Sequence, residues 1–321
     1  MSRSTHGAVS VVVPCYQSSQ TLQPLVEQLL DARPTATDEF EIVLVVDGSP
    51  DATWDVARDL AERHGPVRGI HLSRNYGQHN AIVAGIREAR HPVVVTMDDD
   101  LQHRPGEVPR LLAALTPDLD LVYGVPVAEE HTFWRSFASR FVKHLIARGL
   151  GITSATSISA FRAFRTRLRD GFAELAGPHA SVDVALSWAT TRIGSVPVEM
   201  DARAEGRSNY SFRMLLRHAS NMLLGYSTAP LRLVGYLGFL CAALGTVLLG
   251  VVLWQYFTGS TTVQGFTTLA SMVAVFSGAQ MLAIGVLGEY LGRVHINSVG
   301  QPTYVVAERS GDSKGAPRDI G

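Results

Sequence analysis

A sequence of 321 residues is long enough for a large catalytic domain and an additional segment. Its 28 lysines and arginines nearly balance its 29 aspartates and glutamates, and this net charge of −1 gives no reason to expect nucleic acid as a partner. Its two cysteines, Cys15 and Cys241, are too isolated for a disulfide framework or a zinc site.

Short β-branched runs alternate with helical patterns in the first third of the chain. Strands are predicted at 9–13, 41–46, 67–72 and 93–97, and helices at 22–30, 52–64 and 80–89. This alternation predicts an α/β fold with a mostly parallel central sheet and helices on both faces. The first apolar run is too short for a signal peptide, so we expect this domain to stay in the cytoplasm.

Each of the four predicted strands ends in a polar, turn-forming cluster. The clusters are Pro14-Cys15-Tyr16, Asp47-Gly48-Ser49, Ser73-Arg74-Asn75 and Asp98-Asp99-Asp100. Ligands of such sheets bind at the carboxyl ends of the strands, so the clusters predict one site. No glycine-rich dinucleotide fingerprint or P-loop follows any of these strands, so neither a dehydrogenase nor an ATPase is expected.

The acidic run suits a divalent metal. Asp98 and Asp100 are two residues apart after an apolar strand, and carboxylates that hold Mg²⁺ commonly share it with substrate phosphates. The alternative is a solvated acidic turn, since short acidic motifs recur by chance. Asp99 is expected to point to the opposite side of the extended segment and to be structural. Asp47 could accept hydrogen bonds from a nucleobase or ribose, or could simply cap the following helix.

Two long uncharged stretches follow the α/β pattern. Leu233 to Phe257 exceeds the roughly 20 residues that a membrane-spanning helix needs, and a second stretch covers about 265–288. Arg213, Arg217 and Arg232 precede the first stretch and Arg293 follows the second, so the positive-inside rule places both ends in the cytoplasm. The segment 212–231 mixes basic and apolar residues. It is interpreted as an amphipathic helix on the membrane or as a plain connector.

These motifs resemble glycosyltransferase family 2, which has the GT-A fold. The matching segments are 13–16, 46–51, 73–77 and 97–102, in the order and spacing of the family. Residues 74–79, 100–105 and 287–293, together with the apolar helices, look like the polyprenyl-phosphate branch. That branch includes dolichyl-phosphate mannose synthase and undecaprenyl-phosphate aminoarabinose transferase. The resemblance covers about residues 8–305.

The resemblance implies a division of the chain and a location. A cytoplasmic GT-A nucleotide-sugar-binding domain would cover 1–211, and the juxtamembrane helix 212–231. A hairpin of two transmembrane helices (about 233–257 and 265–288) would lie within 232–292, before a partly disordered cytoplasmic tail over 293–321. The protein would be a multi-pass protein of the inner (plasma) membrane, and relatives suggest a homo-oligomer such as a tetramer.

The resemblance also assigns roles to single residues. Asp98, Asp100 and Gln102 would bind Mg²⁺ or Mn²⁺. The donor nucleotide would contact Pro14, Tyr16, Asp47, Arg74 and Asn75. The acceptor phosphate would bind Arg135 and Ser139, and a loop with Arg203, Arg207 and Ser208 would close over the diphosphate, consistent with the match between guanidinium groups and phosphate oxygens. Asp183 is a candidate for contacting the sugar, or else a first-turn residue of a helix.

The implied reaction moves a sugar from a nucleotide sugar, preferably a UDP-sugar, to a polyprenyl (undecaprenyl or decaprenyl) phosphate, with inversion. The attacking phosphate is already ionised, so the enzyme needs no strong general base. The sequence departs from the family pattern at Val46, 125–127, 156–159 and Asn209, and it does not name the sugar. A processive polysaccharide synthase is an alternative, but the sequence lacks its Gln-x-x-Arg-Trp motif. A catalytically silent scaffold is a second alternative, which the intact metal motif disfavours.

Overall fold

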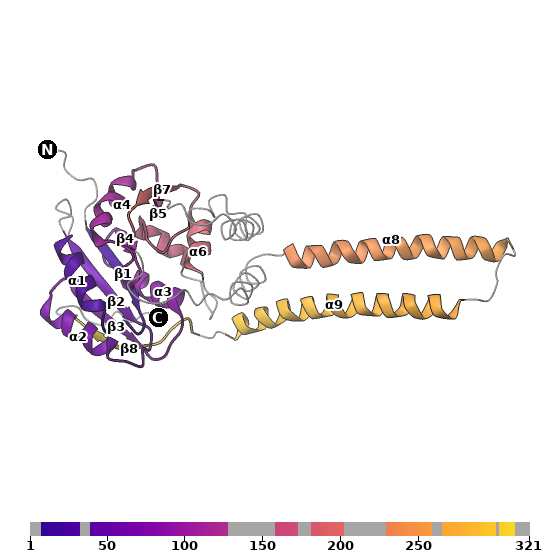
Figure 1. The fold of residues 1–321 in the computed structure, drawn as a ribbon, viewed down its shortest axis with the longest axis horizontal. Helices are drawn as coiled ribbons and strands as arrows, with labels where there is room; N and C mark the ends of the chain where they lie inside the picture. Colours follow the sequence, from indigo (N-terminus) through magenta and orange to yellow (C-terminus); the bar gives the residue numbers. More distant parts are fainter. Residues whose placement is uncertain are drawn as a thin grey trace. The chain divides into compact units, whose positions relative to one another are not determined.

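The computed structural model describes residues 8–32, 39–127, 158–172, 181–201, 229–258, 265–299 and 302–311. These residues belong to two compact units. One unit is built around an eight-stranded sheet and includes the C-terminal strand, and the other contains two long helices (Figure 1).

The sheet has the strand order β7-β5-β6-β4-β1-β2-β3-β8. Its strands are β1 (Val9–Cys15), β2 (Phe40–Val46), β3 (Val67–Leu72), β4 (Val93–Thr96), β5 (Leu121–Pro126), β6 (Arg162–Arg165), β7 (Ile193–Val198) and β8 (Val306–Ser310). Only β6 and β8 run against their neighbours, so the predicted mostly parallel sheet is confirmed. The four early strands lie where the β-branched runs predict them.

Helices cover both faces of the sheet, as predicted. One face carries α1 (Leu22–Asp31), α2 (Thr53–Arg63) and α4 (Val108–Ala114), and the other carries α3 (Gln78–Glu88) and α6 (Val182–Ala189). Alternate strand residues face opposite sides: Val11 and Val13 of β1 pack with the first group, and Val12 packs with the second. The described part of this unit also contains two short 3₁₀ helices, η1 (Pro105–Glu107) and η3 (Thr166–Phe172).

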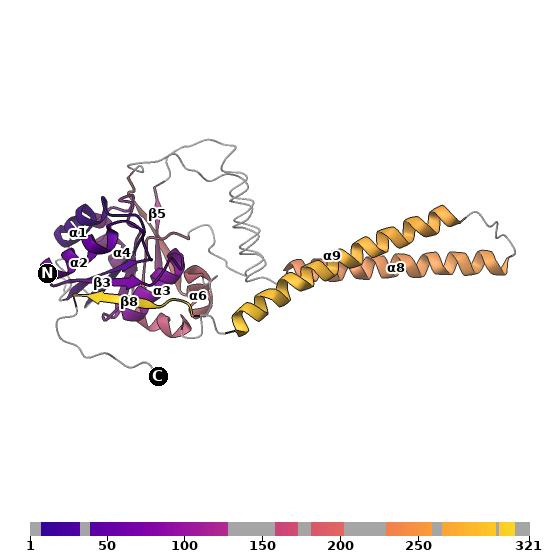
Figure 2. The ribbon, with the colours of Figure 1, turned by 90° about the horizontal axis from the view of Figure 1, so that it is seen from below.

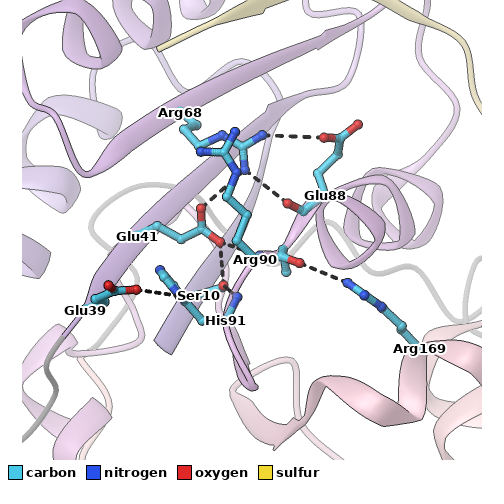
Figure 3. A network of polar contacts seen from close by, with 9 residues as sticks. Ser10, Glu39, Glu41, Arg68, Glu88, Arg90, His91 and Arg169 are labelled. Atoms are coloured by element: carbon cyan, nitrogen blue, oxygen red, sulfur yellow. Dashed lines mark hydrogen bonds and ion pairs between the residues drawn. The ribbon is translucent and has the colours of Figure 1, made fainter. Parts of the chain in front are cut away.

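A buried polar network fixes the amino-terminal edge of the sheet (Figure 3). Glu41 of β2 accepts hydrogen bonds from the Ser10 hydroxyl at 2.5 Å and from the Arg90 backbone N–H at 2.7 Å. The Arg68 guanidinium lies 3.3 Å from Glu41 and 3.5 Å from the carboxylate of Glu88. Both Glu41 and Arg68 are buried, so each charge is compensated by the other.

The second unit contains α8 (Ala229–Phe257) and α9 (Phe266–Ser298), which lie side by side (Figures 1 and 2). Within the described residues, one stretch, Val275–Gly292 of α9, is long and apolar enough to cross a membrane, and the apolar stretch Leu231–Val247 of α8 is shorter. The two predicted spans therefore lie on two real helices. Among the described residues, the stretch in α9 is the only one that meets both the length and the hydropathy requirement for a membrane crossing.

The end of the chain contains a strand that the sequence analysis does not predict. Helix α9 continues to Ser298, and residues 306–310, within the segment expected to be a partly disordered tail, form β8, which pairs with β3 (Figure 2). The prediction missed this strand because its sequence, Val-Ala-Glu-Arg-Ser, is short and charged. An edge strand with one exposed face needs no long apolar run.

Candidate active site

The carboxyl ends of β1, β2 and β4 and the loop after β3 surround a pocket of about 290 Å³. Its lining residues are Pro14, Cys15, Tyr16, Asp47, Asn75, Gly77, Gln78, Asp98, Asp99 and Asp100. The structure thus brings together six of the residues that the sequence assigns to a site: Pro14, Tyr16, Asp47, Asn75, Asp98 and Asp100. Arg74 and Gln102 are neighbours in sequence of these residues but are not part of the lining.

The three consecutive aspartates have different partners. Asp98 accepts a 2.6 Å hydrogen bond from the Gln78 side-chain amide, and Asp100 accepts one of 3.1 Å from the Gln102 backbone N–H. Asp99 turns toward the loop after β1, where the Tyr16 backbone N–H donates to it at 3.1 Å and the Ser18 hydroxyl donates as well. Asp99 therefore joins two strand ends, and it also lines the pocket beside Asp98 and Asp100.

Burial raises the pKa of Asp99, and the nearby charge of Asp98 raises it further, while the bonds from Ser18 and Tyr16 act in the opposite direction. The carboxylates thus repel one another in a partly dehydrated pocket. A cation placed there would relieve this repulsion.

Leu101, next to these aspartates, has φ 61°, and Gln17 in the loop after β1 has φ 56°. Positive φ costs energy for residues other than glycine, and such conformations cluster at functional sites. The one at Leu101 lets the chain reverse so that the Gln102 N–H reaches the Asp100 carboxylate.

Asp47 is buried at the end of β2 and holds the loop after β3. Its two carboxylate oxygens accept hydrogen bonds from the backbone N–H groups of Tyr76 and Gly77, each at 2.7 Å. Burial raises the pKa of Asp47, while these two bonds lower it. The structure therefore gives Asp47 a loop-organising contact that the sequence did not predict, in addition to its place in the pocket lining.

The loop after β2 approaches the loop after β3 closely. Gly48 has φ 55°, and a Cβ atom there would lie 2.1 Å from the carbonyl carbon of Arg74. Only glycine fits this contact. Arg74 itself stacks over the Tyr76 ring, with its Cζ 4.7 Å from the ring centroid, and so shapes the pocket wall from outside the lining.

A second set of contacts joins the segment after β4 to the end of β7. The Asp201 backbone N–H donates to the Gln102 carbonyl at 2.9 Å, and the Arg104 guanidinium Nε donates to the Asp201 carboxylate at 2.8 Å. The Nδ1 atom of buried His103 accepts a 3.1 Å bond from the Asp98 N–H, and its ring stacks on Phe161. Burial lowers the pKa of His103, although nearby Asp100 raises it.

Comparison with known proteins identifies the family. The model of Glycosyl transferase family 2 matches residues 10–172, which include the whole pocket. A transferase of Photorhabdus laumondii, named undecaprenyl-phosphate 4-deoxy-4-formamido-L-arabinose transferase, is 31% identical over 309 residues and covers 95% of both chains. The chain belongs to glycosyl transferase family 2. It is a glycosyltransferase with a GT-A-like α/β fold, as the resemblance implies.

Further relatives of this glycosyltransferase include the enzyme of the same name from an Enterobacter species, which is 33% identical over 93% of this chain and 92% of its own. Among solved structures, glucosyl-3-phosphoglycerate synthase from Mycobacterium tuberculosis with Mn²⁺ and UDP-glucose is 18% identical. It covers 68% of this chain and 77% of its own, with a TM-score of 0.49.

Asp183 of the glycosyltransferase, the second residue of α6, lies in a buried cluster outside the pocket lining. It forms an ion pair with Arg162, whose Nε also donates to the Thr96 hydroxyl at 2.9 Å. The Tyr123 hydroxyl donates to Asp183 at 3.2 Å. Burial raises the pKa of Tyr123, and the Asp183 charge adds to this effect. These contacts link α6 to β4, two residues before Asp98.

Several predicted residues lie outside the described part of the glycosyltransferase. They are Arg135, Ser139, Arg203, Arg207 and Ser208. In turn, sequence reasoning missed Gln78 and Ser18, which hydrogen-bond to Asp98 and Asp99. The only signal in the sequence was their position just after a strand-end cluster, a position that many surface residues share.

Proposed function

We propose that the chain transfers a sugar from a nucleotide sugar, preferably a UDP-sugar, to a polyprenyl phosphate such as undecaprenyl or decaprenyl phosphate. Full-length similarity carries this proposal. The Photorhabdus relative is named for an undecaprenyl-phosphate acceptor, and its match covers 95% of both chains, so it includes the pocket and both long helices. A similarity confined to the catalytic domain would support the family without supporting the acceptor.

The donor set of the pocket fits Mg²⁺ or Mn²⁺ shared with a diphosphate. Asp98 and Asp100 offer hard carboxylate oxygens, and Mg²⁺ is typically held by one or two carboxylates together with substrate phosphates. Among the described residues, no group of three or more His, Cys, Asp or Glu that could hold a metal is found. Gln102 would be the third protein ligand. Such a metal would neutralise charge that develops on the leaving nucleoside diphosphate.

The residues of the chain would otherwise act by positioning. Pro14, Tyr16, Asp47 and Asn75 line the part of the pocket that would receive the base and ribose. Gln78 holds one oxygen of Asp98 and so would orient that carboxylate in the pocket. The acceptor phosphate arrives ionised, so no residue is assigned as a general base, and a direct displacement at the anomeric carbon inverts its configuration.

The remaining assignments belong to the same proposal. Arg135 and Ser139 would bind the acceptor phosphate, and Arg203, Arg207 and Ser208 would close over the diphosphate. Arg74 would reach the donor from behind Tyr76. Asp183 would act on the sugar directly or by fixing α6 beside β4, and its buried ion pair with Arg162 supports the second role.

A membrane location suits a lipid acceptor. We infer that α8 and α9 form a two-helix anchor in the inner membrane, with 1–211 and 293–321 in the cytoplasm and the 212–231 segment along the membrane surface. The 29 residues of α8 and the 33 residues of α9, at about 1.5 Å per residue, exceed a hydrocarbon core of roughly 30 Å. A homo-oligomer, such as a tetramer, is part of the proposal.

The test is a transfer assay with the purified full-length protein in detergent. It is incubated with a panel of radiolabelled nucleotide sugars, Mn²⁺ and undecaprenyl phosphate, and label is measured in the organic phase. We expect one donor to give a labelled lipid, from which mild acid releases the labelled sugar. Label on a soluble polymer would favour a processive synthase instead, and no transfer from any donor would contradict the enzymatic proposal.

A further inference from the structure

Strand β8 enters the sheet at the same edge as the pocket. It pairs antiparallel with β3, and its first residue, Val306, lies opposite Leu72, the last residue of β3. The register is irregular between His71 and Leu72, close to this edge. Without β8, β3 would be an edge strand with a row of unpaired backbone groups. The last described residues of the chain therefore complete the hydrogen bonding of a strand that leads into the pocket.

The pairing continues into the pocket wall. The Ser73 backbone N–H, one residue beyond β3, donates to the Val305 carbonyl at 2.9 Å. Ser73 begins the loop 73–77, which contributes Asn75 and Gly77 to the pocket lining. The loop after β3 is thus bonded on one side to the segment that precedes β8.

Asp47 and Gly48 hold the same loop from the opposite side. The Asp47 carboxylate accepts the backbone N–H groups of Tyr76 and Gly77, and the Arg74 backbone packs against Gly48 too closely for any Cβ atom. The loop is therefore clamped between the end of β2 and the segment before β8. Loss of the contacts on either side of the loop would release the backbone N–H groups of Tyr76 and Gly77, which position the Asp47 carboxylate.

Side chains lock β8 in place on both faces of the sheet. The indole N–H of Trp54 in α2 donates to Glu308 at 2.8 Å, and the indole ring stacks on His71 of β3 at 4.9 Å. On the other face, the Arg309 guanidinium lies 2.9 Å from the Glu88 carboxylate of α3. Trp54 is 9% exposed, and its indole N–H reaches the carboxylate of Glu308 on the exposed side of β8.

We propose that residues 302–310 position the donor pocket, with Trp54 and Glu308 as positioning residues that keep the loop 73–77 in its binding conformation. The inference rests on the proposed function, since it takes the pocket as the nucleotide site. Residues 299–305 also join α9 to β8, so this segment is the covalent link between the apolar helices and the pocket wall.

Hydrogen exchange of two truncated proteins in detergent tests the clamp without any ligand. Deletion of 302–321 removes β8, and deletion of 312–321 leaves it intact as the matched control. We expect the amides of Tyr76 and Gly77 to exchange at least about tenfold faster in the first protein and unchanged in the second. Unchanged protection of both amides after deletion of 302–321 would overturn the proposal.

A point variant avoids the risk that the truncated protein misfolds. Trp54→Phe keeps an aromatic ring beside His71 and removes the N–H that reaches Glu308 together with part of the indole surface. We expect about threefold to tenfold weaker binding of UDP, GDP or CDP with Mn²⁺, whichever binds the unaltered protein, by calorimetry. Arg58→Met, which breaks an exposed ion pair with Asp55 on the same helix as Trp54, should stay within about twofold of the unaltered protein. Equal affinities of Trp54→Phe and the unaltered protein would contradict the positioning role, whereas no nucleotide binding by the unaltered protein would contradict the proposed function.

Discussion

Buried carboxylates have different partners at the two ends of the same parallel strands. At the amino ends, Glu41 lies beside the Arg68 guanidinium, and the pair is closed within the protein (Figure 3). At the carboxyl ends, the acids accept hydrogen bonds from neutral donors: Asp47 from two backbone N–H groups, and Asp99 from a backbone N–H and a hydroxyl. Neutral donors orient a carboxylate but do not cancel its charge.

This difference separates a stabilising edge from a reactive one. A buried ion pair satisfies itself and leaves little field for a ligand. Oriented carboxylates that keep their negative charge attract a cation and repel one another until it arrives. The fold therefore orients Asp47 and Asp99 with neutral donors at the edge where ligands of parallel sheets bind, and pairs Glu41 with a guanidinium at the other edge. The predictions below test this contrast.

The largest effect is expected at the acidic run. Asp100→Asn removes a charge that would hold the metal, and sugar transfer should fall by at least about 100-fold, comparable to the loss of a major electrostatic contact in other enzymes. The melting temperature should be unchanged or slightly higher, because repulsion among the three aspartates decreases. Full transfer by Asp100→Asn at every Mn²⁺ concentration would refute the metal assignment.

A substitution at the amino-terminal edge of the sheet should change the stability of the protein and leave the rate of sugar transfer unchanged. Arg68→Met leaves buried Glu41 without its guanidinium partner, which should cost about 3 kcal/mol of unfolding free energy. Denaturant unfolding measures this loss, and the transfer rate per folded molecule should be unchanged. Arg58→Met is the matched control: its pair with Asp55, at 2.8 Å, is largely exposed and should contribute less than about 0.5 kcal/mol. A rate loss specific to Arg68→Met would contradict the division into two edges.

A smaller effect is expected at Gln78, which orients Asp98 without carrying charge. Gln78→Ala should raise the Mn²⁺ concentration for half-maximal transfer by about tenfold, because Asp98 gains rotational freedom, while saturating metal restores most of the rate. Gln23→Ala, which breaks an exposed 2.9 Å bond to Glu27, serves as the control. An unaltered metal requirement would show that Asp98 is oriented by other contacts.

The smallest effect concerns Asp51, a carboxylate near the pocket that serves the fold. It accepts bonds from the Ser49 hydroxyl and from the N–H and hydroxyl of Thr53, where α2 begins. Burial is the largest single influence and raises the pKa of Asp51, but the hydrogen bonds together outweigh it and lower the pKa from 3.8 to about 2. The stabilisation is therefore present above pH 3.8 and is lost as the pH falls toward 2.

Asp51→Ala should accordingly cost about 1 kcal/mol at neutral pH. The difference in melting temperature from the unaltered protein should be constant from pH 8 to 5 and smaller at pH 3. A difference that does not change with pH would mean that the charge of Asp51 does not contribute.

The sequence predicted the strands and strand ends that depend on local patterns of apolar and polar residues. Apolar runs such as 9–13 and 41–46 are buried strands, and the polar residues after them meet in one pocket because parallel strands place their ends together. Asp98 and Asp100 were found because their motif is contiguous. The metal role of Gln102 stays a prediction, since its contacts in the structure are made by its backbone.

Long-range contacts could not be predicted in the same way. Strand β8 is defined by its pairing with β3 and not by its own sequence, and the Gln78–Asp98 bond joins residues of two different elements. The two bonds that Asp47 receives depend on how closely the loops after β2 and β3 approach. That approach depends on the close contact between Gly48 and the backbone of Arg74, which cannot be predicted from the periodicity of the sequence.

The position of β8 at the end of the chain also sets an order of synthesis. Trp54 and Glu308 are 254 positions apart, so at about 5–20 residues per second the ribosome needs at least roughly ten seconds between them. Both long helices are made within that interval. The sheet thus keeps an open edge at β3 until α8 and α9 have left the ribosome, and the nascent domain is most exposed to aggregation during this time.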